Sequence, residues 1–275
     1  MVSTGRIHTT LFGPNYNLGY PGTLKKKDNL LMLRKVRSKV YRWLAQDSFL
    51  HLNREIIELN DIGELKRIFN WQINPILDDL SLYEYRYIED INQRRLRDAE
   101  SLATVVRNTN PAVCLDIGTA EGHSAALMAI NAPESRIFTI NIPPEEINSK
   151  AAGKLTTMSL ERDRIGSYYR SRNLANITQI LMNTAQWKPD VGIIDIAYID
   201  GCHDTEFVYN DTRKILHNTK VGSFILWHDF NPGLASRYEW IYSVCMGVEK
   251  LYSDKLLRGH IYHVRDSWIG IYELQ

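Results

Sequence analysis

The sequence lacks several features that would assign the protein to a particular class. Its 275 residues contain three cysteines, Cys114, Cys202 and Cys245, none in CxxC spacing, so neither a disulfide framework nor a zinc site is predicted. No apolar run approaches the ~18–20 residues that a membrane helix needs. Residues 1–23 hold one basic residue, Arg6, and lack the apolar segment of a signal peptide. We therefore expect a cytoplasmic protein without a membrane span.

Charge is unevenly distributed along the chain. The composition is otherwise that of a globular protein, with 44% hydrophobic residues, 24% charged residues and a formal net charge of +1. Residues 1–110 contain 17 Lys/Arg and 13 Asp/Glu, whereas residues 111–275 contain 16 and 19. Nine basic residues but only two acidic ones lie within 24–54. This segment would suit phosphate, an acidic partner or a membrane surface, and a solvated helix face is the simpler explanation.

The first third of the chain is predicted to be helical. Residues 1–23 mix Gly, Pro, Asn and Thr without periodicity, and we expect a tail or an extended arm there. Apolar residues then recur at helical spacing, for example over residues 56–68. We therefore expect a helical extension or cap over residues 24–84, followed by a separate domain over residues 85–275.

The pattern changes at Asn110-Pro111, where short apolar runs begin to alternate with helical stretches. This alternation predicts an α/β fold with a mostly parallel sheet. The last two apolar runs are joined by only three residues, so they must form an antiparallel hairpin. The predicted strands cover residues 113–117, 136–142, 177–182, 193–199, 223–227, 260–264 and 268–273, and helices are predicted over 123–131 and 205–218.

A glycine-containing turn follows the first strand of this sheet. In Val113-Cys-Leu-Asp-Ile-Gly-Thr-Ala-Glu-Gly-His-Ser124, a hydrophobic strand leads into Gly118 and Gly122. Gly118 lets the backbone turn sharply close to a ligand, and the helix that starts after Gly122 has free N–H groups that bind anions. Asp116 can hold an ammonium group and Ser124 a carboxylate, which suits a cofactor that carries an amino acid. The spacing is not GxGxxG, which weakens the case for a dinucleotide.

The segment LDIGTAEGHS is similar to motif I of class I S-adenosylmethionine-dependent methyltransferases, especially the branch with the catechol-type and macrocin-type O-methyltransferases. The similarity continues through RIFTINIPPEE, ITQILMNTAQW, IAYIDGCHDTEFVYNDTRKIL and GSFILWHDFNP, in the order of the family's motifs. It covers about residues 85–275. The resemblance implies a Rossmann-like, seven-stranded, mostly parallel sheet that ends in an antiparallel hairpin, and it implies S-adenosylmethionine as the cofactor.

The resemblance also assigns cofactor-binding roles at the ends of several strands. Asn141 stands where the family usually has an acid for the ribose hydroxyls, and Asn183-Thr184 replaces an Asp-Ser pair near the adenine. These residues can still form hydrogen bonds, but the charge-assisted bonds are lost, which would weaken cofactor binding. The implied cofactor-binding residues are Asp116, Gly118, Thr119, Glu121, Gly122, Ser124, Asn141, Asn183, Thr184 and Asp200.

Polar residues follow the fourth and fifth predicted strands, whose carboxyl ends should face one crevice. Asp200 and His203 follow the fourth strand, and Asp229 follows the fifth. By the resemblance, Asp200 would bind a metal and His203, in the same D-G-x-H spacing, would act as general base on a substrate hydroxyl. The family's acidic pair after the fifth strand is reduced to Asp229, because His228 takes the other place. Asn231 could complete a Mg²⁺ site of oxygen ligands.

These features favour an S-adenosylmethionine-dependent O-methyltransferase that acts on a hydroxyl of a small molecule, of the sugar or natural-product type. One alternative is a non-catalytic or weakly binding subunit with the same fold, which Asn141 and Asn183 favour. A second alternative is an NAD-type Rossmann oxidoreductase. Nucleic-acid methylation is not predicted, because no NPPY or DPPY motif occurs and the total charge is near neutral. We also expect a homo-oligomer.

Overall fold

The computed structural model describes residues 48–83, 94–147, 149, 152–156 and 159–275. The predicted N-terminal arm, much of the predicted helical extension and most of the basic segment lie outside these described residues. Within the described residues, no helix is long and apolar enough to cross a membrane. The boundary between the predicted extension and the predicted domain falls where the chain is not described, so this division stays a prediction.

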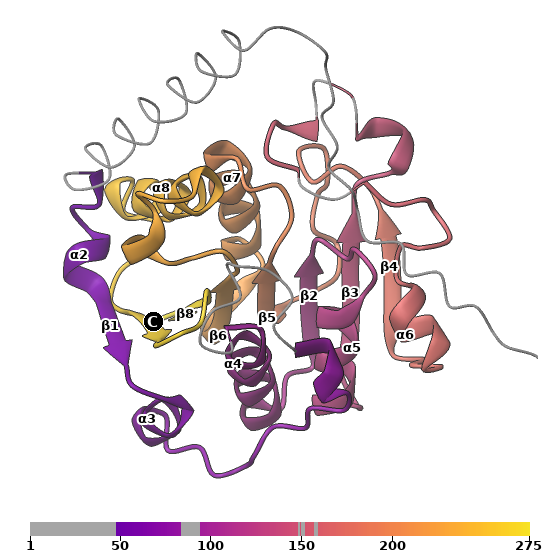
Figure 1. Cartoon of the computed structure of the whole chain (residues 1–275), viewed down its shortest axis with the longest axis horizontal. Helices are drawn as coiled ribbons and strands as arrows, with labels where there is room; N and C mark the ends of the chain where they lie inside the picture. Colours follow the sequence, from indigo (N-terminus) through magenta and orange to yellow (C-terminus); the bar gives the residue numbers. More distant parts are fainter. Residues whose placement is uncertain (1–47, 84–93, 148, 150–151, 157–158) are drawn as a thin grey trace, which may run out of the picture. The chain divides into compact units, whose positions relative to one another are not determined.

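Eight strands form one sheet (Figure 1). They are β1 (Ile56–Leu59), β2 (Val113–Ile117), β3 (Arg136–Asn141), β4 (Ile177–Leu181), β5 (Ile194–Ile199), β6 (Thr219–Trp227), β7 (Ile261–Val264) and β8 (Gly270–Glu273). Their order in the sheet is β1-β7-β8-β6-β5-β2-β3-β4. Strand β8 runs antiparallel to both β6 and β7, and the other neighbouring pairs are parallel. The predicted α/β class with an antiparallel C-terminal hairpin is confirmed.

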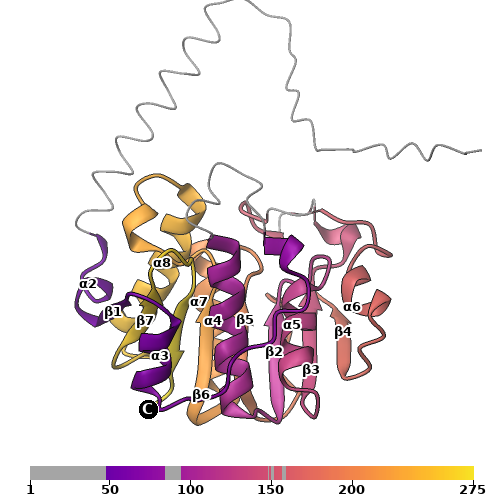
Figure 2. The ribbon, with the colours of Figure 1, turned by 60° about the horizontal axis from the view of Figure 1, so that its bottom comes forward.

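Helices cover both faces of the sheet (Figures 1 and 2). They are α2 (Leu52–Glu55), α3 (Ile62–Ile68), α4 (Arg94–Thr109), α5 (His123–Asn131), α6 (Ser167–Ser171), α7 (Thr205–Leu216) and α8 (Glu239–Ser253), with the 3-10 turns η1 (Leu80–Tyr83), η3 (Pro144–Glu146) and η5 (Pro232–Leu234). Along β2, Val113 and Leu115 pack into the core with α7 and α8, whereas Cys114 packs into the core with α4 and α5. Because side chains alternate across a strand, β2 is buried on both faces.

Strand β1 corrects the prediction of a helix over residues 56–68. Only Ile62–Ile68 is helical, and Ile56–Leu59 pairs in parallel with β7 at the edge of the sheet. Apolar residues at Ile56, Ile57 and Leu59 fit either a helix or a strand, and the two isoleucines favour a strand once an open edge is available. In the part of the chain that the structure describes, the sheet therefore has eight strands, one more than predicted.

The connection from β3 to β4 folds back onto the loop after β2. Tyr168 donates a backbone hydrogen bond to the Glu121 oxygen (2.9 Å), and Gly166 donates to Ala120 (2.9 Å). These contacts fix the β2–α5 loop from outside the sheet. The 15-residue helix α8 was not predicted from the sequence. It packs against α7, on the face of the sheet opposite to α4 and α5.

Candidate active site

Two cavities lie at the carboxyl ends of β2, β3, β5 and β6, where ligands of open α/β sheets bind. The smaller cavity, of about 130 Å³, is lined by the predicted cofactor residues Asn141 and Asn183 together with residues of the β2 and β5 ends. The larger cavity, of about 430 Å³, is lined by η1, α4, α5 and the ends of β5 and β6. Gly118 and Asp200 line both, so the two cavities meet at the ends of β2 and β5.

Two glycines shape the loop between β2 and α5. Gly118 has φ +104°, and a Cβ there would lie 1.9 Å from the backbone oxygen of Asp200. Only glycine therefore lets this loop reach the end of β5. Gly122 has φ +92°, and a Cβ there would lie 2.5 Å from the ring of Tyr169. Gly122 packs against that ring and is not among the residues that line the cavities.

A buried acid and three hydroxyl groups lie beneath this loop. The Asp116 carboxylate is fully buried and accepts hydrogen bonds from Ser124 Oγ (2.8 Å) and Thr139 Oγ1 (2.5 Å). Thr139 Oγ1 also lies 2.7 Å from Thr119 Oγ1. Burial raises the pKa of Asp116 to about 7, although the two hydroxyl donors oppose the shift. We call Asp116, Thr119, Ser124 and Thr139 the hydroxyl network.

The predicted cofactor residues of this loop differ in where they point. Thr119 and Ser124 line the larger cavity, whereas Asp116 lines neither cavity. Glu121 forms ion pairs with Arg164 and with His123 (3.5 Å). The hydrogen bond from Arg164 lowers the pKa of Glu121, and its carboxylate is not among the groups that line either cavity. Of the predicted cofactor-binding residues in and beside this loop, only Gly118, Thr119 and Ser124 therefore line a cavity.

The smaller cavity is lined by Asn141 and Asn183, the two amides at positions where the resemblance implies acids. Asn141 Oδ1 accepts a hydrogen bond from the backbone N–H of Ala120 (3.1 Å), and its Nδ2 donates to the Ile142 oxygen (2.9 Å). Asn183 Oδ1 accepts from the backbone N–H of Ala185 (2.9 Å). Thr184 also lines this cavity, and its hydroxyl donates to Asp211 (3.1 Å). Asn141, Asn183 and Thr184 thus all line one cavity, as predicted cofactor-binding residues should. The side chain of each already forms a hydrogen bond with another residue of the protein.

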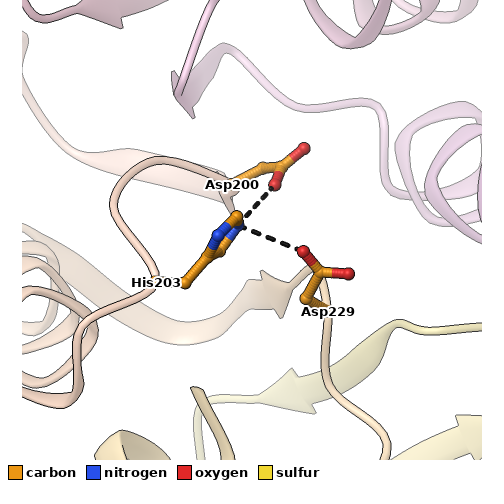
Figure 3. Close-up of side chains that lie close together, drawn as sticks. All are labelled: Asp200, His203 and Asp229. Atoms are coloured by element: carbon orange, nitrogen blue, oxygen red, sulfur yellow. Dashed lines mark hydrogen bonds and ion pairs between the residues drawn. The ribbon is translucent and has the colours of Figure 1, made fainter. Parts of the chain in front are cut away.

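Asp200, His203 and Asp229 come together at the ends of β5 and β6, as the sequence predicted (Figure 3). His203 Nε2 lies 3.1 Å from Asp229 Oδ2 and 3.4 Å from Asp200 Oδ1. His203 and Asp229 are buried, with 5% and 7% of their surfaces exposed. Asp229 has φ +53°, an uncommon conformation for a residue with a side chain. All three side chains line the larger cavity.

Two further residues, which the sequence did not assign to the site, extend this group. His228 Nδ1 lies 3.1 Å from Asp200 Oδ1, and His228 Nε2 lies 3.3 Å from Oδ2 of Asp98 on α4. Both residues line the larger cavity. We call Asp98, Asp200, His203, His228 and Asp229 the charged cluster. No sequence signal could have linked Asp98 to His228, because 130 residues separate them.

The members of the charged cluster shift one another's pKa values. Burial by itself would lower the pKa of His203, but the hydrogen bond to Asp200 and the charge of Asp229 raise it above the ordinary value. Burial likewise opposes a charged His228, yet Asp200 and Asp229 raise its pKa well above the ordinary value. Burial would raise the pKa values of both Asp200 and Asp229, and the neighbouring imidazoles hold them below their usual range.

The predicted Mg²⁺ ligands are not all brought together. Asn231 begins the turn η5, where its Oδ1 accepts from the Leu234 N–H (3.2 Å) and its Nδ2 donates to the Ser267 oxygen (3.4 Å). Mg²⁺ prefers a shell of oxygen ligands, whereas Asp200 Oδ1 faces the nitrogens of two imidazole rings. The described residues therefore do not fit Mg²⁺, and we derive no chemical step through a metal.

Comparisons with known proteins identify the fold. Residues 115–230 match the model of a family described as a methyltransferase domain. The calicheamicin methyltransferase CalS11 aligns with a TM-score of 0.51 at 12% identity, over 97% of this chain and 99% of that one. The S-adenosylhomocysteine-bound methyltransferase PaMTH1 of Podospora anserina aligns with a TM-score of 0.50 at 12% identity, over 78% of this chain and 95% of that one. The curated proteins include no sequence that matches.

Proposed function

We propose that this protein, a class I S-adenosylmethionine-dependent methyltransferase by its matching domain and its fold, transfers a methyl group to a hydroxyl oxygen of a small molecule. The observation that carries the proposal is the position of His203, whose Nε2 lies 3.1 Å from Asp229 Oδ2 at the wall of the larger cavity. A buried imidazole paired with a carboxylate is a suitable base for a hydroxyl. A sugar or another natural-product-type hydroxyl compound is the acceptor class we propose.

We place the cofactor across the two cavities. Its adenosine would occupy the smaller cavity near Asn141 and Asn183, and its methionine part would extend past Gly118 towards Thr119 and Ser124. When bound, S-adenosylmethionine supplies a methyl group activated by an adjacent sulfonium. Asp116, Glu121 and Gly122 line neither cavity. They contact other residues of the protein instead, namely Ser124, Arg164 and Tyr169 respectively. We therefore propose that they act indirectly, by holding the loop.

The protein would act mainly by alignment and by moving one proton. The acceptor hydroxyl would enter between His203 Nε2 and the carboxylates that face it, and give up its proton to the unprotonated nitrogen as its oxygen forms the bond to the methyl carbon and the bond from that carbon to the cofactor's sulfur breaks. Once the ring is protonated, Asp229 and Asp200, whose oxygens lie 3.1 and 3.4 Å from Nε2 in this structure, would stabilise its charge. The surrounding cavity would hold the oxygen and the methyl carbon in line and exclude water, which lowers the barrier by fixing the reacting atoms before the transfer.

A second candidate function rests on Asn141. Both polar groups of its amide are used by the protein, one by Ala120 and the other by Ile142, where the family usually offers an acid to the ribose. A non-catalytic subunit that keeps the fold but binds the cofactor weakly would suit this arrangement. The methyltransferase domain match gives no comparable support to an NAD-type oxidoreductase.

Calorimetry followed by a turnover assay tests both candidates. The full chain is titrated with S-adenosylmethionine and with S-adenosylhomocysteine, and then incubated with a panel of sugar and phenolic hydroxyl compounds while methylated product is followed by mass spectrometry. The proposed enzyme binds both forms and methylates at least one acceptor. Absence of binding to either form would overturn the cofactor assignment, and binding without turnover across the panel would favour the non-catalytic subunit.

A further inference from the structure

Asp98 connects α4 to the ends of β5 and β6 through a buried set of polar contacts. Its Oδ1 accepts the backbone N–H of Trp268 (2.7 Å). Its Oδ2 accepts from Arg94 Nη1 (2.8 Å) and lies 3.3 Å from His228 Nε2. Arg94 in turn lies over the ring of Trp268, at 4.4 Å from its centre. Asp98 is only 6% exposed, so its carboxylate is fixed by donors on three sides.

His228 is held between two carboxylates. Its Nδ1 lies 3.1 Å from Asp200 Oδ1 and its Nε2 lies 3.3 Å from Asp98 Oδ2. Nδ1 can donate to the Asp200 carboxylate, whereas Nε2 faces both the Asp98 carboxylate and the guanidinium of Arg94, whose Nη1 lies 3.5 Å away. The geometry therefore places a ring N–H of the protein directly beside Asp200, with the Arg94 cation at the far side of the ring.

A divalent cation at this position would need the same oxygen atoms. Asp200 Oδ1 already faces His228 Nδ1 at 3.1 Å and His203 Nε2 at 3.4 Å, and Asp229 Oδ2 faces the same two rings at 3.7 and 3.1 Å. A Mg²⁺ ion would have to replace these contacts with bonds of about 2.0–2.1 Å to each oxygen. It would also have to displace the His228 ring, which the contact with Asp98 holds in place. The ion and the ring therefore compete for one position.

We propose that His228, held by Asp98, takes the position of a divalent cation beside Asp200 and Asp229, so that this site neither binds nor needs one. His228 is here a positioning residue: it fixes the Asp200 carboxylate and leaves His203 to act on the substrate. The inference concerns the site of the proposed function. It rests on that function only in taking the site to be the active site of a methyltransferase. The test below measures metal binding rather than methyl transfer, so either can fail without the other.

The test replaces the imidazole of His228 by a carboxylate. The full chain and the variant His228→Asp are dialysed against a chelator, returned to chelator-free buffer and titrated with Mn²⁺, whose free-ion paramagnetic resonance signal reports uptake. We expect no uptake by the unaltered protein and uptake of about one ion per chain by His228→Asp, because the variant adds an oxygen ligand where it removes the ring. His228→Asn is the matched control, which removes the ring without adding charge and should bind at least tenfold more weakly than His228→Asp.

A second measurement covers the case in which His228→Asp folds poorly. His228→Glu carries the same carboxylate on a longer side chain, and 1 mM Mn²⁺ should raise its melting temperature by ~4 °C while leaving that of the unaltered protein unchanged. Two results would overturn the proposal. One is uptake of Mn²⁺ by the unaltered protein that Asp200→Asn abolishes. The other is absence of Mn²⁺ uptake by folded His228→Asp and His228→Glu, since removal of the ring would then not open a site for the ion.

Discussion

At the ends of β2 and β3 the site is built from hydroxyl and amide groups, whereas at the ends of β5 and β6 it is built from ions. The hydroxyl network contains one acid, Asp116, whose pKa burial raises to about 7. The charged cluster contains three carboxylates and two imidazoles within direct contact of one another. Gly118 and Asp200, which line both cavities, mark the boundary between the two groups.

This difference indicates that the two groups of residues have different functions. Neutral hydrogen bonds each contribute about 1 kcal/mol and act over short distances, which suits the shaping of a loop around a ligand. Buried ions depend on one another, because removing one partner leaves the other charged and unpaired. Changes in the hydroxyl network should therefore affect folding and cofactor affinity. Changes in the charged cluster should affect the transfer step and, where they leave a buried charge unpaired, stability as well.

The largest expected effect is that of His203→Ala. Loss of the base should lower kcat by roughly 10²–10⁴-fold, while the affinity for S-adenosylhomocysteine, measured by calorimetry, stays within about threefold. His217→Ala, which removes an exposed imidazole at the end of α7, is the matched control and should leave both quantities unchanged. A parallel loss of cofactor affinity in His203→Ala would erase the proposed difference between the two groups.

The second expected effect concerns Asp116 and the pH dependence of stability. Its pKa of about 7 in the folded protein exceeds the value of about 3.9 in an unfolded chain, so the folded state binds more protons between these values. This contribution is fully present below about pH 4 and is lost as the pH rises towards 7. By the linkage relation it amounts to at most about 4 kcal/mol of unfolding free energy.

Asp116→Asn should remove much of this slope. Urea unfolding between pH 5 and pH 8 measures it, and the variant should lose less stability over that range than the unaltered protein. Asp211, whose pKa burial also raises to about 7, keeps part of the slope in the variant. Asp190→Asn, at an exposed position, serves as control. Equal slopes in Asp116→Asn and the unaltered protein would mean that the hydroxyl network does not hold a protonatable acid.

The sequence predicted the central strands and helices because their patterns are local. The runs over β2 and β5 are apolar except for Asp116 and Asp195, and α5 was predicted with its observed bounds. Strand β1 was missed because its spacing fits two structures and only the open edge of β7 decides between them. The helix α8 was missed as well; its Gly247, which disfavours a helix by itself, packs closely against Val208 of α7.

The site, too, could be predicted only where local sequence patterns determine it. The proximity of Asp200, His203 and Asp229 could be predicted because each follows a strand, and neighbouring strand ends meet at one edge of a parallel sheet. The contact of Asp98 with His228 depends instead on how α4 is rotated and placed on the sheet, which no local pattern encodes. The capping of the turn η5 by the Asn231 side chain could likewise not be read from its position after the fifth strand.

The smallest expected effect is that of Asn141→Asp, which adds a charge to the neutral side of the site. The carboxylate can still accept from the Ala120 N–H, but it can no longer donate to the Ile142 oxygen, so its second oxygen should turn towards the cavity. A charge-assisted bond to a ribose hydroxyl exceeds a neutral one by about 1 kcal/mol, which corresponds to roughly fivefold tighter binding of S-adenosylhomocysteine in calorimetry. Asn210→Asp on α7 makes the same change of charge outside both cavities and should leave affinity unaltered. If Asn141→Asp bound no more tightly than the unaltered protein, neutrality at this position would not be what limits cofactor affinity, and the contrast between the two groups would lose its functional meaning.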